Sequence, residues 1–240
     1  SYALFRNLAV NATYYVQVRA ISANGAESIF TSLGSTATLA AIPSTAASTY
    51  TLVAISSLTF QWQANSNPSD TIYIAEVSSF SNFSLISGSS STLLTQAALT
   101  GLTANNTYYA RVRAQNHQGV RTEYALLGST VTKAFIPSAA GTAYLNIELS
   151  SLTFQWQANN NPSDTLYTAE ISSFSGFSLI ADSSQTLITQ AAFSGLSLNT
   201  SYYARVRAQN REGIQTNNLI LSSTATLAAI PSTAASTYTL

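Results

Sequence analysis

The chain has 240 residues, with nine Lys and Arg, nine Asp and Glu, one His and no Cys or Met, so its formal net charge is zero. A neutral chain without a run of basic residues lacks the positive surface that nucleic acids and anionic membranes attract, so neither is expected as a partner. Only 8% of the residues are charged and 46% are hydrophobic, which argues against intrinsic disorder and predicts a buried core. The apolar stretches are all shorter than the ~20 residues of a spanning helix, so we expect no membrane insertion in this segment.

The sequence repeats with a period of 94 residues. Tyr-Tyr pairs begin at positions 14, 108 and 202, and Ile-Pro pairs begin at positions 42, 136 and 230. Roughly three-fifths of the positions are identical between residues 43–136 and 137–230, as expected of recently duplicated modules. With boundaries at the Ile-Pro pairs, residues 43–136 and 137–230 are two complete modules.

The two ends of the sequence are parts of modules. Residues 1–42 align with the last part of a module, and residues 231–240 copy residues 43–52, the first strand of a following module. We expect three strands in residues 1–42, with Tyr14, Val16 and Val18 facing inward and with nothing to cover them. Either the preceding part of a longer chain or another chain completes this sheet; we favour the first.

Each complete module shows the period-two pattern of half-buried strands. In residues 57–63, Leu58, Phe60 and Trp62 share one face, while Thr59 and Gln61 lie on the other. Residues 108–114 alternate in the same way, and both patterns recur in residues 151–157 and 202–208. Turn-forming residues separate about seven such strands in each module, the number found in a sandwich of the immunoglobulin type.

Three segments resemble a known family. The sequences SLTFQW at 57–62, TIYIAEV at 71–77 and LTANNTYYARVRA at 102–114 resemble strands B, C and F of a fibronectin type III domain. The resemblance extends over the whole chain and implies an all-β fold of tandem immunoglobulin-like sandwiches. It also implies structural roles: Trp62 and Trp156 lie at the core centres, and Tyr14, Tyr108 and Tyr202 donate their hydroxyls to backbone carbonyls at the corner between strands E and F.

Charged residues on neighbouring strands predict cross-strand ion pairs. Glu76 is expected beside Arg111 or Arg113, and its counterpart Glu170 beside Arg205 or Arg207. We expect these pairs to be exposed and to contribute ~0–1 kcal/mol each.

We find no set of residues for catalysis, a cofactor or a metal, and predict that the chain is not an enzyme. The only histidine, His117, is replaced by Ala23 and Arg211 in the other repeats, which favours a surface loop residue over a proton shuttle. Asp70 with Glu76 is a conceivable pair of catalytic carboxylates, but a loop cap and an ion pair explain them better. Asn65, Asn67 and Asp70 offer too little charge for a Ca²⁺ site.

Four asparagines lie in glycosylation motifs. Asn11, Asn105 and Asn199 occupy one position of the repeat, and Asn82 is a fourth candidate glycan acceptor. Asn in a tight corner also suits turn geometry, and we favour that interpretation for the three aligned motifs.

The surface composition suggests a function. Ser and Thr number 67 against 18 charged residues, so the exterior must consist largely of small neutral side chains on which modules can pack without desolvating charges. The Ile-Pro junctions have no flexible linker, so we expect a stiff rod rising roughly 30–35 Å per module.

We therefore interpret the chain as a structural segment of a long extracellular or cell-surface polymer, a filament, stalk or sheath, whose partner is itself through end-to-end and lateral packing. The alternative is a spacer, adhesin or carbohydrate-binding array that holds another domain away from the cell and contacts surface glycans. A composition bias of bacterial extracellular proteins explains the Ser/Thr/Asn-rich, Lys-poor surface equally well, and by this composition we expect a bacterial source.

Overall fold

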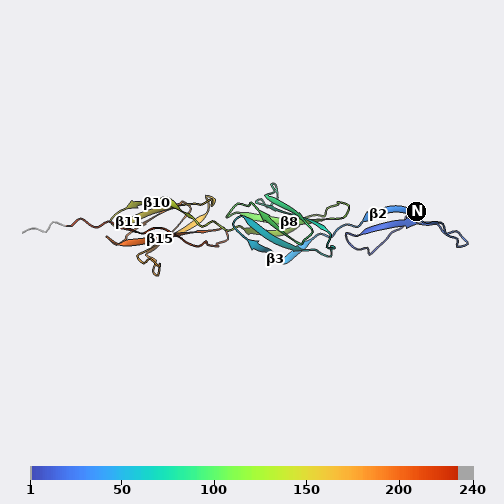
Figure 1. Ribbon diagram of the computed structural model, residues 1–240, viewed down its shortest axis with the longest axis horizontal. Coiled ribbons are helices and arrows are strands. Elements are labelled where there is room, and N and C mark those ends of the chain that lie inside the picture. Colours follow the sequence, from blue (N-terminus) through green and yellow to red (C-terminus); the bar gives the residue numbers. More distant parts are fainter. Residues whose placement is uncertain (1, 232–240) are drawn as a thin grey trace, which may run out of the picture. The chain divides into compact units, whose positions relative to one another are not determined.

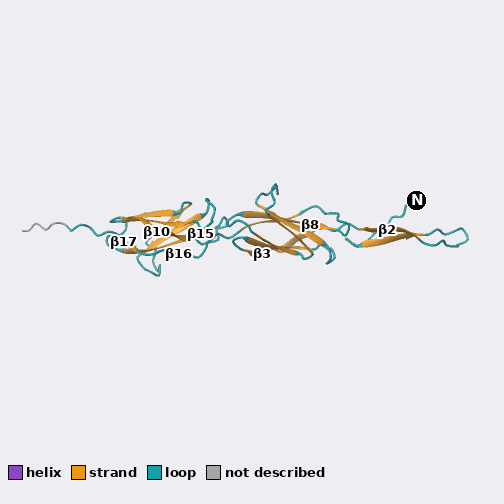
Figure 2. Cartoon of the chain, turned by 45° about the horizontal axis from the view of Figure 1, so that its top comes forward, coloured by secondary structure: helices purple, strands orange, loops and turns teal. Residues whose placement is uncertain are grey.

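The computed structural model describes residues 2–231, which form seventeen β-strands and no helix (Figure 2). The chain divides into two compact units. Unit 1 contains the chain up to Thr103 together with Thr107–Thr132, and unit 2 contains Ala104–Asn106 and the chain from Lys133 onward. The predicted all-β class is confirmed.

Unit 1 contains a hairpin and a complete sandwich, whose strands β3 and β8 are labelled in Figure 1. The hairpin pairs β1 (Thr13–Val18) with β2 (Thr31–Ala37). One sheet of the first sandwich has the order β3-β4-β7 and the other the order β6-β5-β8-β9. The seven strands of the first sandwich are β3 (Ser44–Val53), β4 (Ser57–Gln63), β5 (Ile72–Ser78), β6 (Gly88–Thr92), β7 (Gln96–Thr100), β8 (Thr107–Gln115) and β9 (Ala125–Val131).

Unit 2 repeats this topology in a second sandwich, with sheets β10-β11-β14 and β13-β12-β15-β16. The last strand of the second sandwich is interrupted. Two short strands, β16 and β17, pair with β15, whereas in the first sandwich the single strand β9 pairs with β8. The strands of the second sandwich are β10 (Ser138–Ile147), β11 (Ser151–Gln157), β12 (Leu166–Ser172), β13 (Asp182–Thr186), β14 (Gln190–Ser194), β15 (Ser201–Gln209), β16 (Leu219–Ile220) and β17 (Thr224–Ala225).

The alternation in the sequence produces the two cores. In β4 and β11 every second side chain is buried, so Phe60 and Trp62 in one sandwich, and Phe154 and Trp156 in the other, face the opposite sheet. Trp62 packs against Tyr73 with ring centroids 5.6 Å apart, and Trp156 packs against Tyr167 at the same distance. The two tryptophans therefore join the two sheets of their sandwiches.

The prediction of three strands in residues 1–42 is wrong. The described residues before β1 form no strand, and only β1 and β2 pair. The equivalent strand of the first sandwich, β7, is held by pairing with β4, and the hairpin has no counterpart of β4. The hairpin face is correspondingly open: Val18 is half exposed, whereas its equivalents Val112 and Val206 are fully buried.

Candidate functional site

The corner before β1, β8 and β15 is built around a tyrosine. The hydroxyl oxygens of Tyr14, Tyr108 and Tyr202 accept hydrogen bonds from the backbone N–H groups five residues upstream, at 2.9, 2.9 and 3.0 Å. The family resemblance implied that these hydroxyls donate to carbonyls. That detail is wrong: at all three corners it is an N–H group that points at the phenolic oxygen.

An asparagine follows in each corner, in the left-handed backbone region. The φ angles of Asn11, Asn105 and Asn199 are 45°, 46° and 45°. Asparagine tolerates this conformation better than most other non-glycine residues. The backbone N–H of each donates to a carbonyl at 3.0–3.1 Å, which sets the direction of the Cα–Cβ bond. We call these three residues the corner asparagines.

In unit 1 the amide of corner asparagine Asn11 is inserted between two loops of the first sandwich. Its side chain is fully buried. The amide nitrogen donates to Thr71 Oγ1 at 2.8 Å, and the amide oxygen accepts the backbone N–H of His117 at 2.9 Å. Thr71 lies just before β5, and His117 lies in the loop between β8 and β9. One side chain thus satisfies a buried hydroxyl and a loop N–H.

Unit 2 contains the same arrangement. Asn105 is 1% exposed, donates to Thr165 Oγ1 at 2.9 Å and accepts the backbone N–H of Arg211 at 2.8 Å. Thr165 is fully buried. The nitrogen and the oxygen of the buried Asn105 amide both have hydrogen-bond partners. The corner is therefore fixed in position relative to both loops.

A second asparagine in each unit supports the corner. Asn67 donates to the carbonyl oxygen of Ala41 and accepts its N–H group, at 2.8 and 2.7 Å, and Asn161 does the same with Phe135 at 2.8 Å for each bond. Each of these two amides therefore makes the same two hydrogen bonds with the backbone leading into the sandwich that a neighbouring β-strand would make. Asn65, which with Asn67 and Asp70 was weighed as a Ca²⁺ site, donates its amide to the carbonyl of Ile42.

Ionisable side chains flank the two buried corners. His117 Nε2 lies 3.1 Å from Asp70 Oδ2 in unit 1, and Arg211 Nη2 lies 2.6 Å from Asp164 Oδ2 in unit 2. Arg211 also donates to the side chain of Asn106 at 3.0 Å. His117, interpreted from the sequence as a loop residue, thus takes part in the corner through its backbone and its ring.

Burial decides part of the glycosylation question. A glycan on Asn11 or Asn105 would replace a hydrogen of the amide that donates to Thr71 or Thr165, inside the protein. The interpretation of these two residues as candidate glycan acceptors is therefore wrong. Asn82 and Asn199 are exposed, and their modification stays a prediction.

The cross-strand ion pairs lie on the outer face of β5-β8 and β12-β15. Arg111 contacts Glu76 Oε2 through Nε at 2.8 Å and Nη2 at 2.7 Å. Arg205 Nε lies 2.6 Å from Glu170 Oε2, and Arg207 Nη2 lies 3.1 Å from Oε1. Arg113, the alternative partner of Glu76, instead lies 4.5 Å from the ring centre of Tyr124.

We expected these pairs to be exposed, and that is wrong, because aromatic side chains cover them. The Arg111 guanidinium lies between the rings of Phe83 and Tyr124, at 4.3 and 3.8 Å, and Phe177 covers Arg205 at 4.4 Å. Phe83 and Phe177 reach over the arginines from loops in which both have positive φ, 55° and 53°. The Glu170 side chain is accordingly only 10% exposed.

The environment of Glu170 has opposing effects on its pKa. Burial raises the pKa, but hydrogen bonds from Arg205 and Arg207, with their charges, outweigh it and hold the pKa of Glu170 below its usual 4.5. The carboxyl thus binds its proton less readily in the folded than in the unfolded chain. Its contribution to stability is present above the unfolded pKa and is lost as the pH falls through the folded one.

We expect Glu170→Gln to lower the free energy of unfolding of unit 2 by about 1–3 kcal/mol near neutral pH, because two largely buried guanidinium groups lose their charged partner. The difference from the unchanged chain should shrink as the pH is lowered below about 4.5. Calorimetry at several pH values, which resolves the unfolding of the two units, measures this. A difference that stays constant with pH would show that the ionised carboxylate is not the stabilising group.

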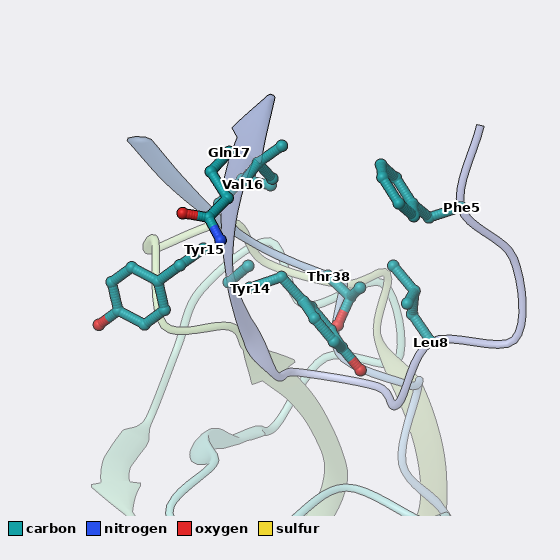
Figure 3. A pocket seen from close by; sticks show the side chains of 9 residues that line it. Phe5, Leu8, Tyr14, Tyr15, Val16, Gln17 and Thr38 are labelled. Atoms are coloured by element: carbon teal, nitrogen blue, oxygen red, sulfur yellow. The ribbon is translucent and has the colours of Figure 1, made fainter. Parts of the chain in front are cut away.

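Unit 1 also has an apolar pocket of about 310 Å³ at the open face of the hairpin. Figure 3 shows Phe5 and Leu8, from the segment before β1, on one side and Tyr14 and Val16 of β1 on the other. No carboxylate, histidine, lysine or arginine lines it. Among residues 2–231, no three His, Asp or Glu side chains gather where they could hold a metal ion. The same residues include no helix long and apolar enough to span a membrane.

Comparisons with known proteins show the fold. No family model and no curated protein matches the sequence. Among solved structures, a two-domain fibronectin type III segment of chicken tenascin is 13% identical, with a TM-score of 0.52, over 78% of this chain and all of that one. The FN1–FN3 domains of chicken CNTN1 are 16% identical, with a TM-score of 0.34, over 88% of this chain and 77% of that one.

Proposed function

With the fold of tandem fibronectin type III domains as the starting point, we propose that the chain is a structural segment of an extracellular tandem-repeat polymer, whose modules pack end to end and side by side. The observation that carries the proposal is that the same large apolar side chains are exposed in both sandwiches. A surface of this kind is suited to being covered by another copy of the same surface.

Four positions of the repeat have this property. Each holds a leucine or isoleucine that is more than half exposed in both sandwiches. The pairs, 94 residues apart, are Leu85 and Leu179, Leu93 and Leu187, Leu94 and Ile188, and Leu126 and Ile220. On a chain with 8% charged residues, little electrostatic repulsion opposes contact between such surfaces.

The corners support end-to-end packing. In each unit a corner asparagine is buried against Thr and a loop N–H of the sandwich, and a second asparagine holds the entering chain. A flexible spacer has no need of buried polar joints, because each one costs the desolvation of an amide. A stalk or filament gains stiffness from them.

Lateral packing predicts self-association of the 240-residue chain. We expect its mean mass to rise with concentration and the double variant Leu94→Ser, Ile188→Ser to suppress this rise, because two exposed apolar side chains are lost from the contact. Sedimentation velocity over a concentration series measures it. The matched control is the double variant Gln96→Ser, Gln190→Ser, which changes two exposed polar residues that also lie 94 residues apart.

The competing function gives a different result. A spacer or adhesin array would sediment as a monomer at every concentration, and the Leu94→Ser, Ile188→Ser variant would behave like its control. That outcome would contradict lateral packing as part of the function.

A further inference from the structure

The third corner has the conformation of the other two without their partner. Its backbone is held by Asn199 N–H to the carbonyl of Leu227 at 3.1 Å and by Thr200 N–H to Thr226 Oγ1 at 3.0 Å. Thr226 Oγ1 also donates to the carbonyl of Ser197 at 2.7 Å. At the first corner, Ala12 and Thr38 make the corresponding bonds. The direction of the Asn199 Cα–Cβ bond is therefore set before anything binds to the side chain.

The side chain of Asn199 has nothing to bind within the described residues. It is exposed, and its amide makes no hydrogen bond there, whereas Asn11 and Asn105 are 0% and 1% exposed and have both amide atoms paired. Next to it, Leu198 is 48% exposed, while the equivalent Ala104 is 3% exposed. The third corner thus presents an amide beside an apolar side chain on an open surface.

The structure also shows, twice, what such an amide binds. The partner is a sandwich that offers a buried threonine hydroxyl before its third strand and a backbone N–H in the loop before its last strand. That loop is itself preformed, because Asn116 Oδ1 accepts the N–H groups of Gln118 and Val120, at 3.1 and 2.8 Å. In unit 2, Asn210 Oδ1 accepts the N–H groups of Glu212 and Ile214 at the same two distances.

We propose that Asn199 is a docking residue for one further sandwich of this repeat. A threonine hydroxyl of that sandwich accepts a hydrogen bond from the amide nitrogen of Asn199, and a loop N–H donates to the amide oxygen, as Thr71 and His117 do with Asn11. The inference rests on the proposed function, because its partner is another copy of the repeat. Neither Thr71 nor Thr165 can serve as that partner in this chain, since Asn11 and Asn105 already occupy them.

The test uses the 240-residue chain and an extended chain. Residues 231–240 copy residues 43–52, so a copy of residues 53–136 added after Leu240 supplies a complete further sandwich. We expect the Asn199 side-chain amide, followed by NMR, to exchange with solvent about tenfold more slowly in the extended chain. This measurement needs no substitution and therefore does not depend on a variant that folds.

The substitution Asn199→Ala measures the contribution of the side chain to docking. Asn199→Ala in the 240-residue chain changes only an exposed side chain and a left-handed backbone position. In the extended chain it also removes the docking contacts. We expect it to raise the unfolding equilibrium constant of the added sandwich about tenfold or more, beyond its effect in the 240-residue chain.

Equal exchange rates in the two chains, or equal effects of Asn199→Ala in both, would overturn the proposal. The outcome is separable from that of the proposed function. Exchange is measured on dilute chains that do not associate laterally, so failed docking leaves the sedimentation result standing. A failed sedimentation test likewise leaves the exchange measurement interpretable.

Discussion

Trp156→Ala is expected to lower the free energy of unfolding of unit 2 by about 3–5 kcal/mol. The indole is 2% exposed and packs between Phe154 and Tyr167, with ring centroids 6.0 and 5.6 Å away. Its removal leaves a cavity between two sheets that cannot collapse without breaking their pairing. Calorimetry, which resolves the unfolding of the two units, measures the change.

The chain supplies its own controls for this experiment. It has two tryptophans, one in each unit, so the fluorescence of Trp62 in the Trp156→Ala variant reports unit 1, which should unfold as before. Leu187→Ala changes an exposed leucine of unit 2 and should stay within about 0.5 kcal/mol of the unchanged chain. Similar losses from Trp156→Ala and Leu187→Ala would contradict the assignment of Trp156 to the core.

Asn105→Ala is expected to destabilise unit 2 by about 2–4 kcal/mol, because it leaves two groups without a partner. The hydroxyl of the fully buried Thr165 loses its donor, and the backbone N–H of Arg211 loses its acceptor. Each orphaned group costs roughly 1–3 kcal/mol. Calorimetry, which resolves the unfolding of the two units, reports on unit 2, which contains all three residues.

Alanine also fits a left-handed backbone position less well than asparagine, and Asn199→Ala separates this cost from the lost hydrogen bonds. Asn199 belongs to the same unit and has nearly the same φ, but its side chain is exposed. We expect Asn199→Ala in the 240-residue chain to cost about 0.5–1 kcal/mol. If the two substitutions cost the same, the side-chain bonds of Asn105 contribute nothing and the corner is only a turn.

The fold could be predicted because it depends on a local signal. Leu58, Phe60 and Trp62 alternate with polar residues over a few positions, and the alternation alone decides which side faces the core. The repeat then gave the same information twice. The missing strand before β1 was not predictable in this way, because a strand needs a neighbour as well as a pattern, and β7 has β4 where the hairpin has none.

The corners could be predicted only in part. The sequence marked Asn11, Asn105 and Asn199 as turn residues, and the structure has them in the left-handed region that such turns use. Their partners were not predictable, since Thr71 lies 60 residues and His117 lies 106 residues further along the chain. The available signal was that Asn and Thr recur together at a fixed separation, as Asn11 with Thr71 and Asn105 with Thr165.

The choice of arginine partners for Glu76 and Glu170 depends on one position at which the repeats differ. Tyr124 attracts Arg113 away from Glu76, and its counterpart, Asn218, has no ring, so Arg207 turns to Glu170 instead. Sequence patterns give the register of Glu76 opposite Arg111, but not the path of the loop that brings Phe83 over them.

The order of the corner contacts along the chain has a consequence for synthesis. Asn11 precedes both Thr71 and His117, and Asn105 precedes both Thr165 and Arg211. A chain is made from its amino terminus, so the asparagine leaves the ribosome before the groups that will bind it. In each unit the loops that bury the corner asparagine are therefore made after it, so these contacts can form in only one order along the chain during synthesis.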